Sequence, residues 1–129
     1  MKLLLDTHAI LWMIADDPRL PESARRLLLT VDDVAWSTAS LWEIGIKLSL
    51  NRRDFHLGAS WERLIPAEMT RNRIQRLDLE PAHCAAVSKL PWHHRDPFDR
   101  LLVAQARCEK RKLLSCDPTF DGYGVERFW

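Results

Sequence analysis

The sequence has few cysteines and no long apolar run, and these two absences exclude several classes of protein. Three cysteines in 129 residues (Cys84, Cys108 and Cys116) are too few and too scattered for a disulfide framework or a zinc knuckle. We expect them to be small buried side chains in a reducing compartment. The apolar stretch before Asp6 is too short for a signal peptide, and no run reaches membrane-spanning length. These features predict a cytoplasmic protein.

The chain also lacks a strong excess of charge of either sign. Its 19 Lys and Arg residues stand against 18 Asp and Glu residues, which gives a formal net charge of +1. Any affinity for nucleic acid must therefore come from a local patch. Apolar residues make up 47% and charged residues 29%, and there is no Gly/Ser linker or repeat, so we expect one globular domain over residues 1–129.

Short apolar runs alternate with helical segments along the chain. Buried strands are expected at 2–6, 33–36 and 112–117, a short exposed strand at 74–79 and a short edge strand at 125–128. Helices are expected at 7–15, 21–29, 37–50, 60–69, 81–90 and from Pro97 onward. This alternation predicts a parallel sheet covered by helices, an α/β sandwich.

Two carboxylates directly follow buried strands. Asp6 ends the first strand and Asp117 follows the last buried one, at the edge where open α/β sheets bind ligands. Each is also well placed to cap a helix, Asp117 especially because Pro118 comes next. The pattern leaves both interpretations open for these two residues.

The segment "HRDPFDRLLVAQA" (94–106) contains two aspartates in different surroundings. Asp96 precedes Pro97 and is a strong candidate for a helix N-cap. Asp99 also suits the first helical turn, where the helix dipole favours a carboxylate. However, it heads an apolar stripe through Leu102, Val103 and Ala106, which turns it toward the body of the protein. Since a buried carboxylate needs a partner, we interpret Asp99 as a site residue.

The helix expected at 37–50 is apolar around most of its circumference, and Glu43 and Lys47 form a narrow polar stripe on it. An exposed Glu–Lys pair four residues apart would contribute only about 0.2–0.5 kcal/mol. A helix this apolar is mostly buried, so we expect the stripe to line a crevice. Gly45, which costs roughly 1 kcal/mol relative to Ala in a helix interior, indicates a close approach there. We interpret Glu43 as a site residue.

If these four acids converge, their mutual repulsion must be compensated. At about 4 Å and an effective dielectric constant of 20, each like-charged pair costs roughly 4 kcal/mol. Such a cluster stays ionised only beside a cation, or it takes up protons. Oxygen ligands without Cys or suitably spaced His favour Mg²⁺ or Mn²⁺ over Zn²⁺. One or two such ions suit the hydrolysis of phosphate esters.

Four segments, "LLLDTHAILW", "STASLWEIGIKLSL", "HRDPFDRLLVAQA" and "LLSCDPTF", together resemble the PIN-domain ribonucleases, and closely the VapC toxins of bacterial toxin–antitoxin pairs. The resemblance covers essentially the whole chain. It implies a PIN-like three-layer α/β/α sandwich with a central, mainly parallel sheet. It also implies a metal-dependent endoribonuclease that cuts single-stranded or looped RNA and leaves 5′-phosphate and 3′-hydroxyl ends. The implied partners are a second copy, in a homodimer, and a VapB-like antitoxin whose tail occupies the groove.

The resemblance also implies roles for individual residues. The acidic quartet of the family corresponds to Asp6, Glu43, Asp99 and Asp117. The first and third of these would be the main metal ligands, Glu43 a ligand or a positioner of the water, and Asp117 a residue acting through a water. Thr7 would orient a carboxylate, and Asp96 is an additional acid that caps the helix and stands in the outer shell of the site.

Contacts with RNA are less well defined. Lys47 and Arg100, which neighbour two of the acids, are the best-placed candidates for phosphate contacts. Seven basic residues against three acidic ones between positions 47 and 76 would either follow a phosphate backbone or form a solvated surface; they are Lys47, Arg52, Arg53, Arg63, Arg71, Arg73 and Arg76. Among six tryptophans, Trp36 and Trp42 are expected in the core. His93 and His94 are not expected to bind one ion together, but near the mouth of the pocket they would be able to contact phosphate.

Two other functions are considered. An aspartyl-phosphate phosphatase of the haloacid-dehalogenase type also has an Asp after its first strand. That chemistry needs a second Asp two residues later, where this chain has His8. A non-catalytic RNA-binding or protein-interaction module with a PIN-like fold is the other alternative, and the complete acidic quartet counts against it.

Overall fold

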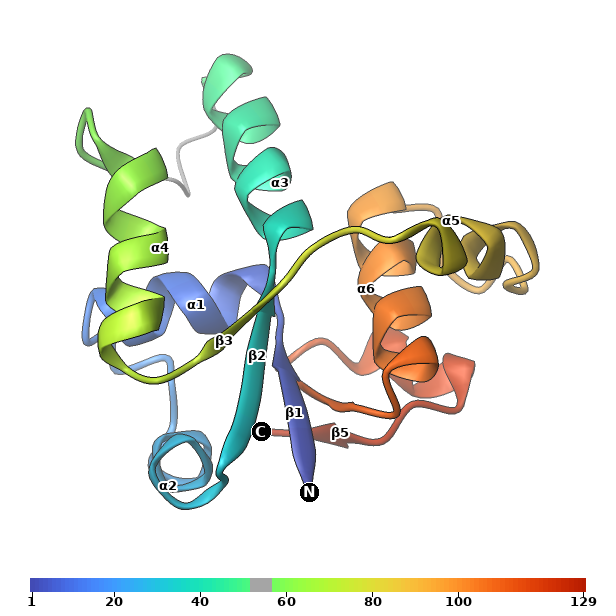
Figure 1. Cartoon of the computed structure of the whole chain (residues 1–129), viewed down its shortest axis with the longest axis horizontal. Coiled ribbons are helices and arrows are strands. Elements are labelled where there is room, and N and C mark those ends of the chain that lie inside the picture. Colours follow the sequence, from blue (N-terminus) through green and yellow to red (C-terminus); the bar gives the residue numbers. More distant parts are fainter. Residues whose placement is uncertain (52–56) are drawn as a thin grey trace.

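The computed structural model of the chain describes residues 1–51 and 57–129. Along them run β1 (Lys2–Leu5), α1 (Thr7–Ile14), α2 (Glu22–Thr30), β2 (Asp33–Ser37), α3 (Thr38–Ser49), α4 (Trp61–Arg71), β3 (Gln75–Leu77), α5 (Pro81–Ser88), α6 (Pro97–Cys108), β4 (Lys112–Leu114), the 3₁₀ helix η1 (Pro118–Tyr123) and β5 (Arg127–Phe128) (Figure 1). The predicted strand at 112–117 is shorter than expected, because the chain turns toward η1 after Leu114.

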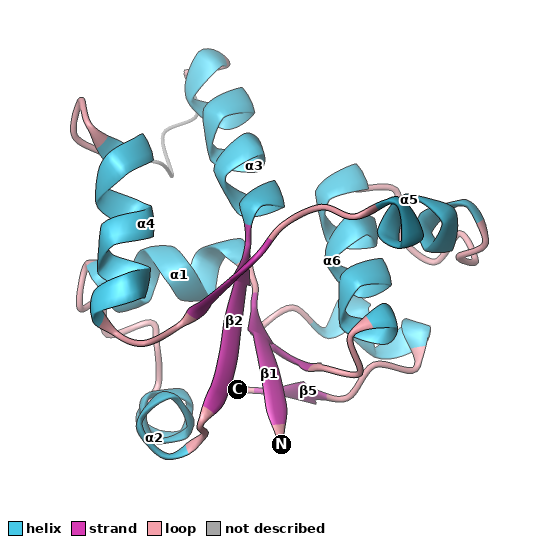
Figure 2. Ribbon diagram, viewed as in Figure 1, coloured by secondary structure: helices cyan, strands magenta, loops and turns pink. Residues whose placement is uncertain are grey.

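The five strands form one sheet in the order β3-β2-β1-β4-β5, and all four pairings are parallel (Figure 2). The central strand β1 pairs through Leu4 with Ala35 of β2 and Leu113 of β4. The predicted exposed strand β3 and the predicted edge strand β5 form the two edges of the sheet. The predicted parallel sheet is therefore confirmed.

Helices cover both faces of this sheet. Leu3 and Leu5 pack on one face with apolar side chains of α1, α2, α3 and α4, and Leu4 packs on the other face with α5, α6 and η1. Alternation along β1 therefore feeds two separate cores, as a parallel strand buried on both faces requires. All three leucines are 0% exposed, and burial contributes roughly 1.5–3 kcal/mol for each. The predicted three-layer α/β/α sandwich is confirmed.

Some predictions about burial are wrong. All three cysteines are exposed rather than buried. Cys84 follows His83, the buried residue of α5, and Cys108 is the last residue of α6, beyond its buried run 100–106. Trp36 is buried as predicted, whereas Trp42 is 59% exposed on α3. Within the described ranges, no helix has the length and apolar character needed to cross a membrane.

Candidate active site

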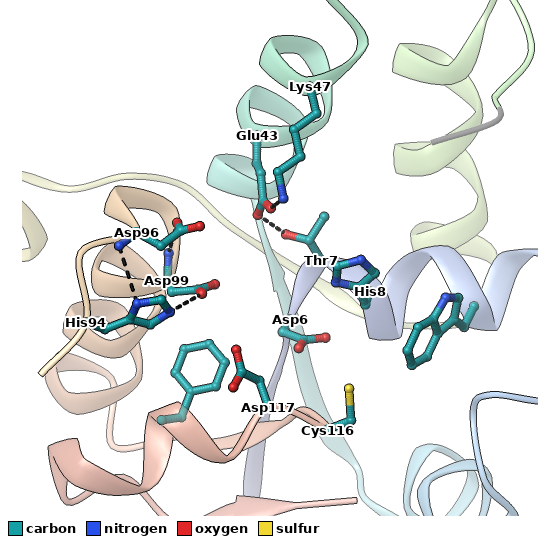
Figure 3. A pocket seen from close by; sticks show the side chains of 12 residues that line it. Asp6, Thr7, His8, Glu43, Lys47, His94, Asp96, Asp99, Cys116 and Asp117 are labelled. Carbon is teal, nitrogen blue, oxygen red and sulfur yellow. Dashed lines mark hydrogen bonds and ion pairs between the residues drawn. The ribbon is translucent and has the colours of Figure 1, made fainter. Parts of the chain in front are cut away.

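A cavity of about 440 Å³ opens where β1 and β4 end, between α3 and α6 (Figure 3). All four acids that the sequence predicts to converge line this cavity, together with three of their predicted neighbours: Asp6, Thr7, Glu43, Lys47, Asp96, Asp99 and Asp117. Four separated segments of the chain supply these residues. The fold, and not proximity in sequence, therefore assembles the site.

Asp6 and Asp117 each cap a helix at the edge of the cavity. Asp6 Oδ1 accepts the Ala9 N–H at 2.7 Å at the start of α1. Asp117 Oδ1 accepts from the N–H and the hydroxyl of Thr119, at 3.0 and 2.8 Å, at the start of η1. A carboxylate has about four acceptor positions on two oxygens, so capping leaves each side chain able to take another partner. The cap and site interpretations are therefore compatible.

Both oxygens of the Glu43 carboxylate are held by neighbours inside the protein. Thr7 Oγ1 donates to Oε1 at 2.6 Å, and Lys47 Nζ donates to Oε2 at 2.6 Å. Glu43 is 4% exposed, and the Lys47 side chain is 18% exposed. The Glu43–Lys47 pair is thus an i,i+4 ion pair that lines a cavity, in contrast to the exposed pair that its spacing alone would allow.

Asp96 and Asp99 have different tasks at the start of α6. Asp96 Oδ1 accepts the N–H groups of Phe98 and Asp99 at 2.9 and 3.1 Å, which confirms the predicted N-cap. The Asp99 side chain lines the cavity and is 20% exposed. Its burial, with a further contribution from the charge on Asp96, raises the pKa of the Asp99 carboxyl to about 7.

The carboxyl of Asp6 is also buried in the cavity, and its pKa is raised as well. It is 6% exposed, and desolvation raises the pKa of its carboxyl above the ordinary value. Hydrogen bonds from Ser115 and Ala9 oppose this rise, and the negative charge on Glu43 adds to it. The cavity therefore disfavours negative charge at two of its four predicted acids, and a bound cation would relieve both.

His94 is a residue of the cavity to which the sequence assigned no definite role. Its Nε2 lies 2.8 Å from Asp99 Oδ2. One ligand atom from each of His94, Asp99 and Asp117 can be chosen so that the three lie within 4.8 Å of one another. The histidine stands two residues before the acidic segment "DPFD", which is a visible signal in the sequence. However, a loop has no periodicity from which the direction of a side chain can be inferred.

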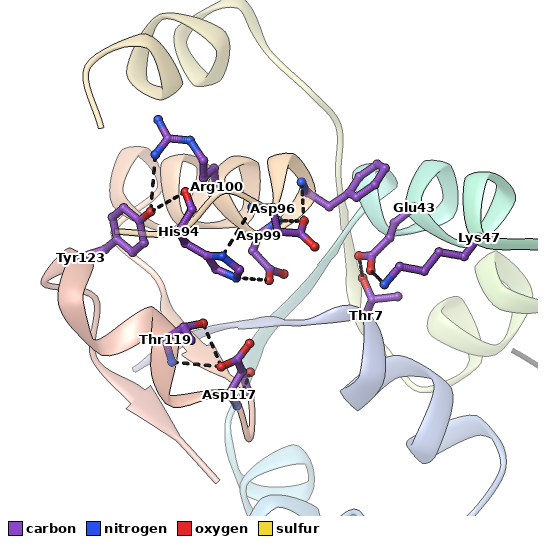
Figure 4. A network of polar contacts seen from close by, with 12 residues as sticks. Thr7, Glu43, Lys47, His94, Asp96, Asp99, Arg100, Asp117, Thr119 and Tyr123 are labelled. Carbon is purple, nitrogen blue, oxygen red and sulfur yellow. Dashed lines mark hydrogen bonds and ion pairs between the residues drawn. The ribbon is translucent and has the colours of Figure 1, made fainter. Parts of the chain in front are cut away.

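Arg100, a predicted RNA contact, lies inside the protein and does not line the cavity (Figure 4). It is 4% exposed, and its two terminal nitrogens donate to backbone carbonyls of the segment 87–91 and to the Tyr123 hydroxyl. The Trp92 ring stacks on its guanidinium at 4.0 Å. This placement does not fit the predicted phosphate contact, because the guanidinium is occupied in holding the loop before α6.

The basic stretch between positions 47 and 76 is largely paired with acids where the structure describes it. Three arginines form exposed ion pairs: Arg63 with Glu62, Arg71 with Glu68 and Arg76 with Asp78. These pairs favour the interpretation of a solvated surface over that of a surface that follows a phosphate backbone. Arg52 and Arg53 lie outside the described residues.

The donor set of the cavity fits a hard divalent cation. Five carboxylates line the cavity and outnumber its other potential ligands, the imidazoles of His8 and His94 and the thiol of Cys116. Oxygen donors are the ligands that Mg²⁺ and Mn²⁺ prefer. Burial is the main cause that raises the pKa of both Asp6 and Asp99, and a cation bound beside them would offset this cost. Asp6 and Asp99 line the same cavity, and Asp99 also belongs, with His94 and Asp117, to the group whose ligand atoms lie within 4.8 Å of one another.

Several solved structures resemble the fold over nearly its whole length. VapBC2 from Rickettsia felis, bound to a DNA fragment from its promoter, matches with a TM-score of 0.70 at 15% identity, covering 99% of this chain and 98% of that chain. DNA-bound VapBC from Salmonella typhimurium matches with a TM-score of 0.70 at 18% identity, covering 99% and 97%. FitAcB from Neisseria gonorrhoeae matches with a TM-score of 0.65 at 16% identity, covering 98% and 96%.

Comparison of the sequence with known proteins identifies a family. No curated protein matches the chain significantly. Residues 3–126 match the family model described as PIN domain. This match spans nearly all of the chain, including the four segments that carry the acids and the elements that position them. The chain therefore belongs to the PIN domain family.

Proposed function

We propose that the chain is a metal-dependent endoribonuclease of the VapC type, which hydrolyses phosphodiester bonds of single-stranded or looped RNA. The observation that carries the proposal is the convergence of Asp6, Glu43, Asp99 and Asp117 on one cavity. Membership of the PIN domain family supports a nuclease. The presence of VapBC complexes among the similar structures supports the toxin of a toxin–antitoxin pair.

Asp6 and Asp99 would hold Mg²⁺ or Mn²⁺, as one or two ions, with Glu43 and Asp117 beside them. When bound, the metal supplies an activated water and neutralises charge on the phosphate. The protein supplies a rigid set of acceptors. Glu43 cannot rotate freely because Thr7 and Lys47 hold its two oxygens, so it is suited to orient the attacking water. Asp117 is held by Thr119 and would act through a water.

Two residues support this arrangement in different ways. Asp96 fixes the first turn of α6 and thereby the direction in which Asp99 leaves the helix. Lys47 places an ammonium group at the wall of the cavity, next to the acids. An ammonium there would attract a phosphate group of the RNA toward the carboxylates, which on their own would repel it.

The proposed partners are RNA, a second copy of the chain in a homodimer, and a VapB-like antitoxin in the cytoplasm. The VapBC complexes among the similar structures support the antitoxin. On α3, Trp42, Ile46 and Leu50 follow one another at intervals of four residues and are 59%, 40% and 64% exposed. Contiguous exposed apolar side chains are typical of protein contact surfaces, which supports a protein partner.

RNA cleavage by the purified protein tests the proposal. Structured and unstructured RNAs are incubated with Mg²⁺ or Mn²⁺ and, separately, with EDTA. We expect metal-dependent cleavage that Asp6→Asn and Asp99→Asn each reduce by roughly 100-fold or more, because each removes a charged ligand. Asp78→Asn is the matched control, since Asp78 is exposed and pairs with Arg76. If both site variants cut as fast as the parent, the assignment of the site is wrong.

A further inference from the structure

His94 lies between the cap of α6 and a proposed metal ligand. The Asp96 backbone N–H donates to His94 Nδ1 at 3.4 Å, and His94 Nε2 lies 2.8 Å from Asp99 Oδ2. Because Nδ1 accepts a hydrogen bond, the ring proton of the neutral imidazole is on Nε2. Nε2–H therefore donates to Asp99 Oδ2. One backbone group thus selects the tautomer that holds the Asp99 carboxylate.

We propose that His94 is the positioning residue of Asp99: its Nε2–H holds Oδ2, so that Oδ1 is the oxygen presented to the metal. The inference rests on the metal site of the proposed function. A side chain that fixes a metal ligand from behind removes rotational freedom that metal binding would otherwise have to remove. The helix fixes the backbone of Asp99 but not the rotation of its side chain, and a hydrogen-bond partner is needed to restrict that rotation.

His94 is itself held from the protein interior. The Tyr123 hydroxyl lies 3.4 Å from the His94 carbonyl and donates to it, and Arg100 donates to the same hydroxyl at 3.4 Å (Figure 4). Arg100 also donates to the Pro91 carbonyl at 2.8 Å. The buried guanidinium thus anchors the loop at two points, directly at Pro91 before the histidine and, through Tyr123, at the carbonyl of His94 itself. This gives Arg100 a role in the site without contact to RNA.

The alternative role for His94 is direct metal ligation together with Asp99 and Asp117, whose ligand atoms lie within 4.8 Å. A ligating Nε2 must carry no proton, so in the neutral ring the proton would move to Nδ1. Nδ1–H would then face the Asp96 N–H, and the bond between them would become a contact between two donors. The observed hydrogen bonds therefore favour positioning over ligation.

Mn²⁺ binding to the purified protein without RNA tests the inference, with free Mn²⁺ followed by electron paramagnetic resonance. We expect His94→Ala to weaken Mn²⁺ binding about 10-fold or more, as is usual for residues that orient a metal ligand. His94→Gln, whose amide N–H can still donate to Asp99, should recover most of the affinity. Asp78→Asn is the control, because Asp78 is exposed, pairs with Arg76 and does not line the cavity.

Three outcomes would overturn the inference: parent affinity in His94→Ala, affinity in His94→Gln as weak as in His94→Ala, or a spin-echo signal of nitrogen bound directly to Mn²⁺ in the parent. We expect no such nitrogen signal. If His94→Ala does not fold, the Mn²⁺ affinity of His94→Gln and the nitrogen signal of the parent still test whether His94 positions Asp99. A parent that binds no Mn²⁺ would refute the proposed metal site itself, and the inference with it. Unchanged binding in His94→Ala would refute only the role of the histidine.

Discussion

The pKa of Asp99 predicts that the metal-free protein becomes less stable as the pH rises. Burial raises this pKa from 3.8 to about 7 in the folded state. Between about pH 4 and 7 the folded protein therefore keeps a proton that the unfolded chain releases. Stability is highest below this range, falls with rising pH across it, and is level above it. The sign is opposite to that of an aspartate whose folded pKa is lowered by an ion pair.

The magnitude follows from the same two values. A carboxyl whose pKa moves from 3.8 to about 7 on folding changes the free energy of unfolding by at most roughly 4 kcal/mol. About 2–3 kcal/mol of this falls between pH 5 and 8. The Asp99 side chain is 20% exposed, so these figures are upper values. Urea denaturation in EDTA at the two pH values measures the change, and Asp99→Asn, which cannot titrate, supplies the baseline.

We expect the parent to lose more stability than Asp99→Asn between pH 5 and 8, by up to about 2–3 kcal/mol. Equal losses in the two proteins would refute the argument that Asp99 is protonated in the metal-free cavity. Saturating Mn²⁺ provides a second control. Because protons and metal compete for the same carboxylate, Mn²⁺ should stabilise the parent more at pH 8 than at pH 5.

Two further substitutions test how Glu43 is held. Lys47→Met leaves a carboxylate that is 4% exposed without its cation, so we expect a loss of about 3 kcal/mol in urea denaturation without metal, and partial recovery on addition of Mn²⁺. A stability equal to that of the parent would show that the ion pair does not compensate Glu43. Thr7→Val removes the 2.6 Å hydrogen bond while keeping the shape of the side chain, and should cost roughly 1–3 kcal/mol in the same assay. A neutral result would mean that another donor replaces the hydroxyl.

The fold could be predicted because its strands, the order of its elements and the edges of its sheet can each be recognised from a short stretch of sequence. The run "LLL" in β1 is buried on both faces, which is the pattern of a parallel strand between two layers of helices. The alternation of strands with helices then fixes a parallel sheet, and short polar segments mark its edges. Asp6 and Asp117 could be placed at the carboxyl edge because the ends of parallel strands meet there, whereas Glu43 and Asp99 were inferred from their positions on helices.

Predictions of which side chains are buried were wrong where the periodicity of a helix allows two different buried faces. The helix α3 has two apolar stripes, one through Leu41, Ile44 and Leu48 and one through Trp42 and Ile46, and the sequence does not say which one another element covers. The structure leaves the second stripe largely exposed. The predicted RNA contact of Arg100 was wrong for a related reason. Neighbours in a helix point about 100° apart around its axis, so adjacency to Asp99 in sequence does not bring Arg100 into the cavity.

Three of the acids around the cavity are helix N-caps: Asp6 for α1, Asp96 for α6 and Asp117 for η1. Capping and the proposed metal site therefore share residues, because two of the four acids proposed to act there, Asp6 and Asp117, are also helix caps. The coincidence also decides which substitutions are informative. Asn caps a helix about as well as Asp but carries no charge, whereas Ala removes both cap and charge.

At Asp6 the two substitutions should therefore separate the two roles. Asp6→Asn should leave the metal-free protein as stable as the parent or more stable, because it removes a buried charge and keeps the cap at Ala9. Asp6→Ala should be less stable than Asp6→Asn by about 1 kcal/mol, the usual contribution of an N-cap. Both should abolish Mn²⁺ stabilisation in thermal denaturation. If Asp6→Asn retained that stabilisation, Asp6 would be a cap and nothing more.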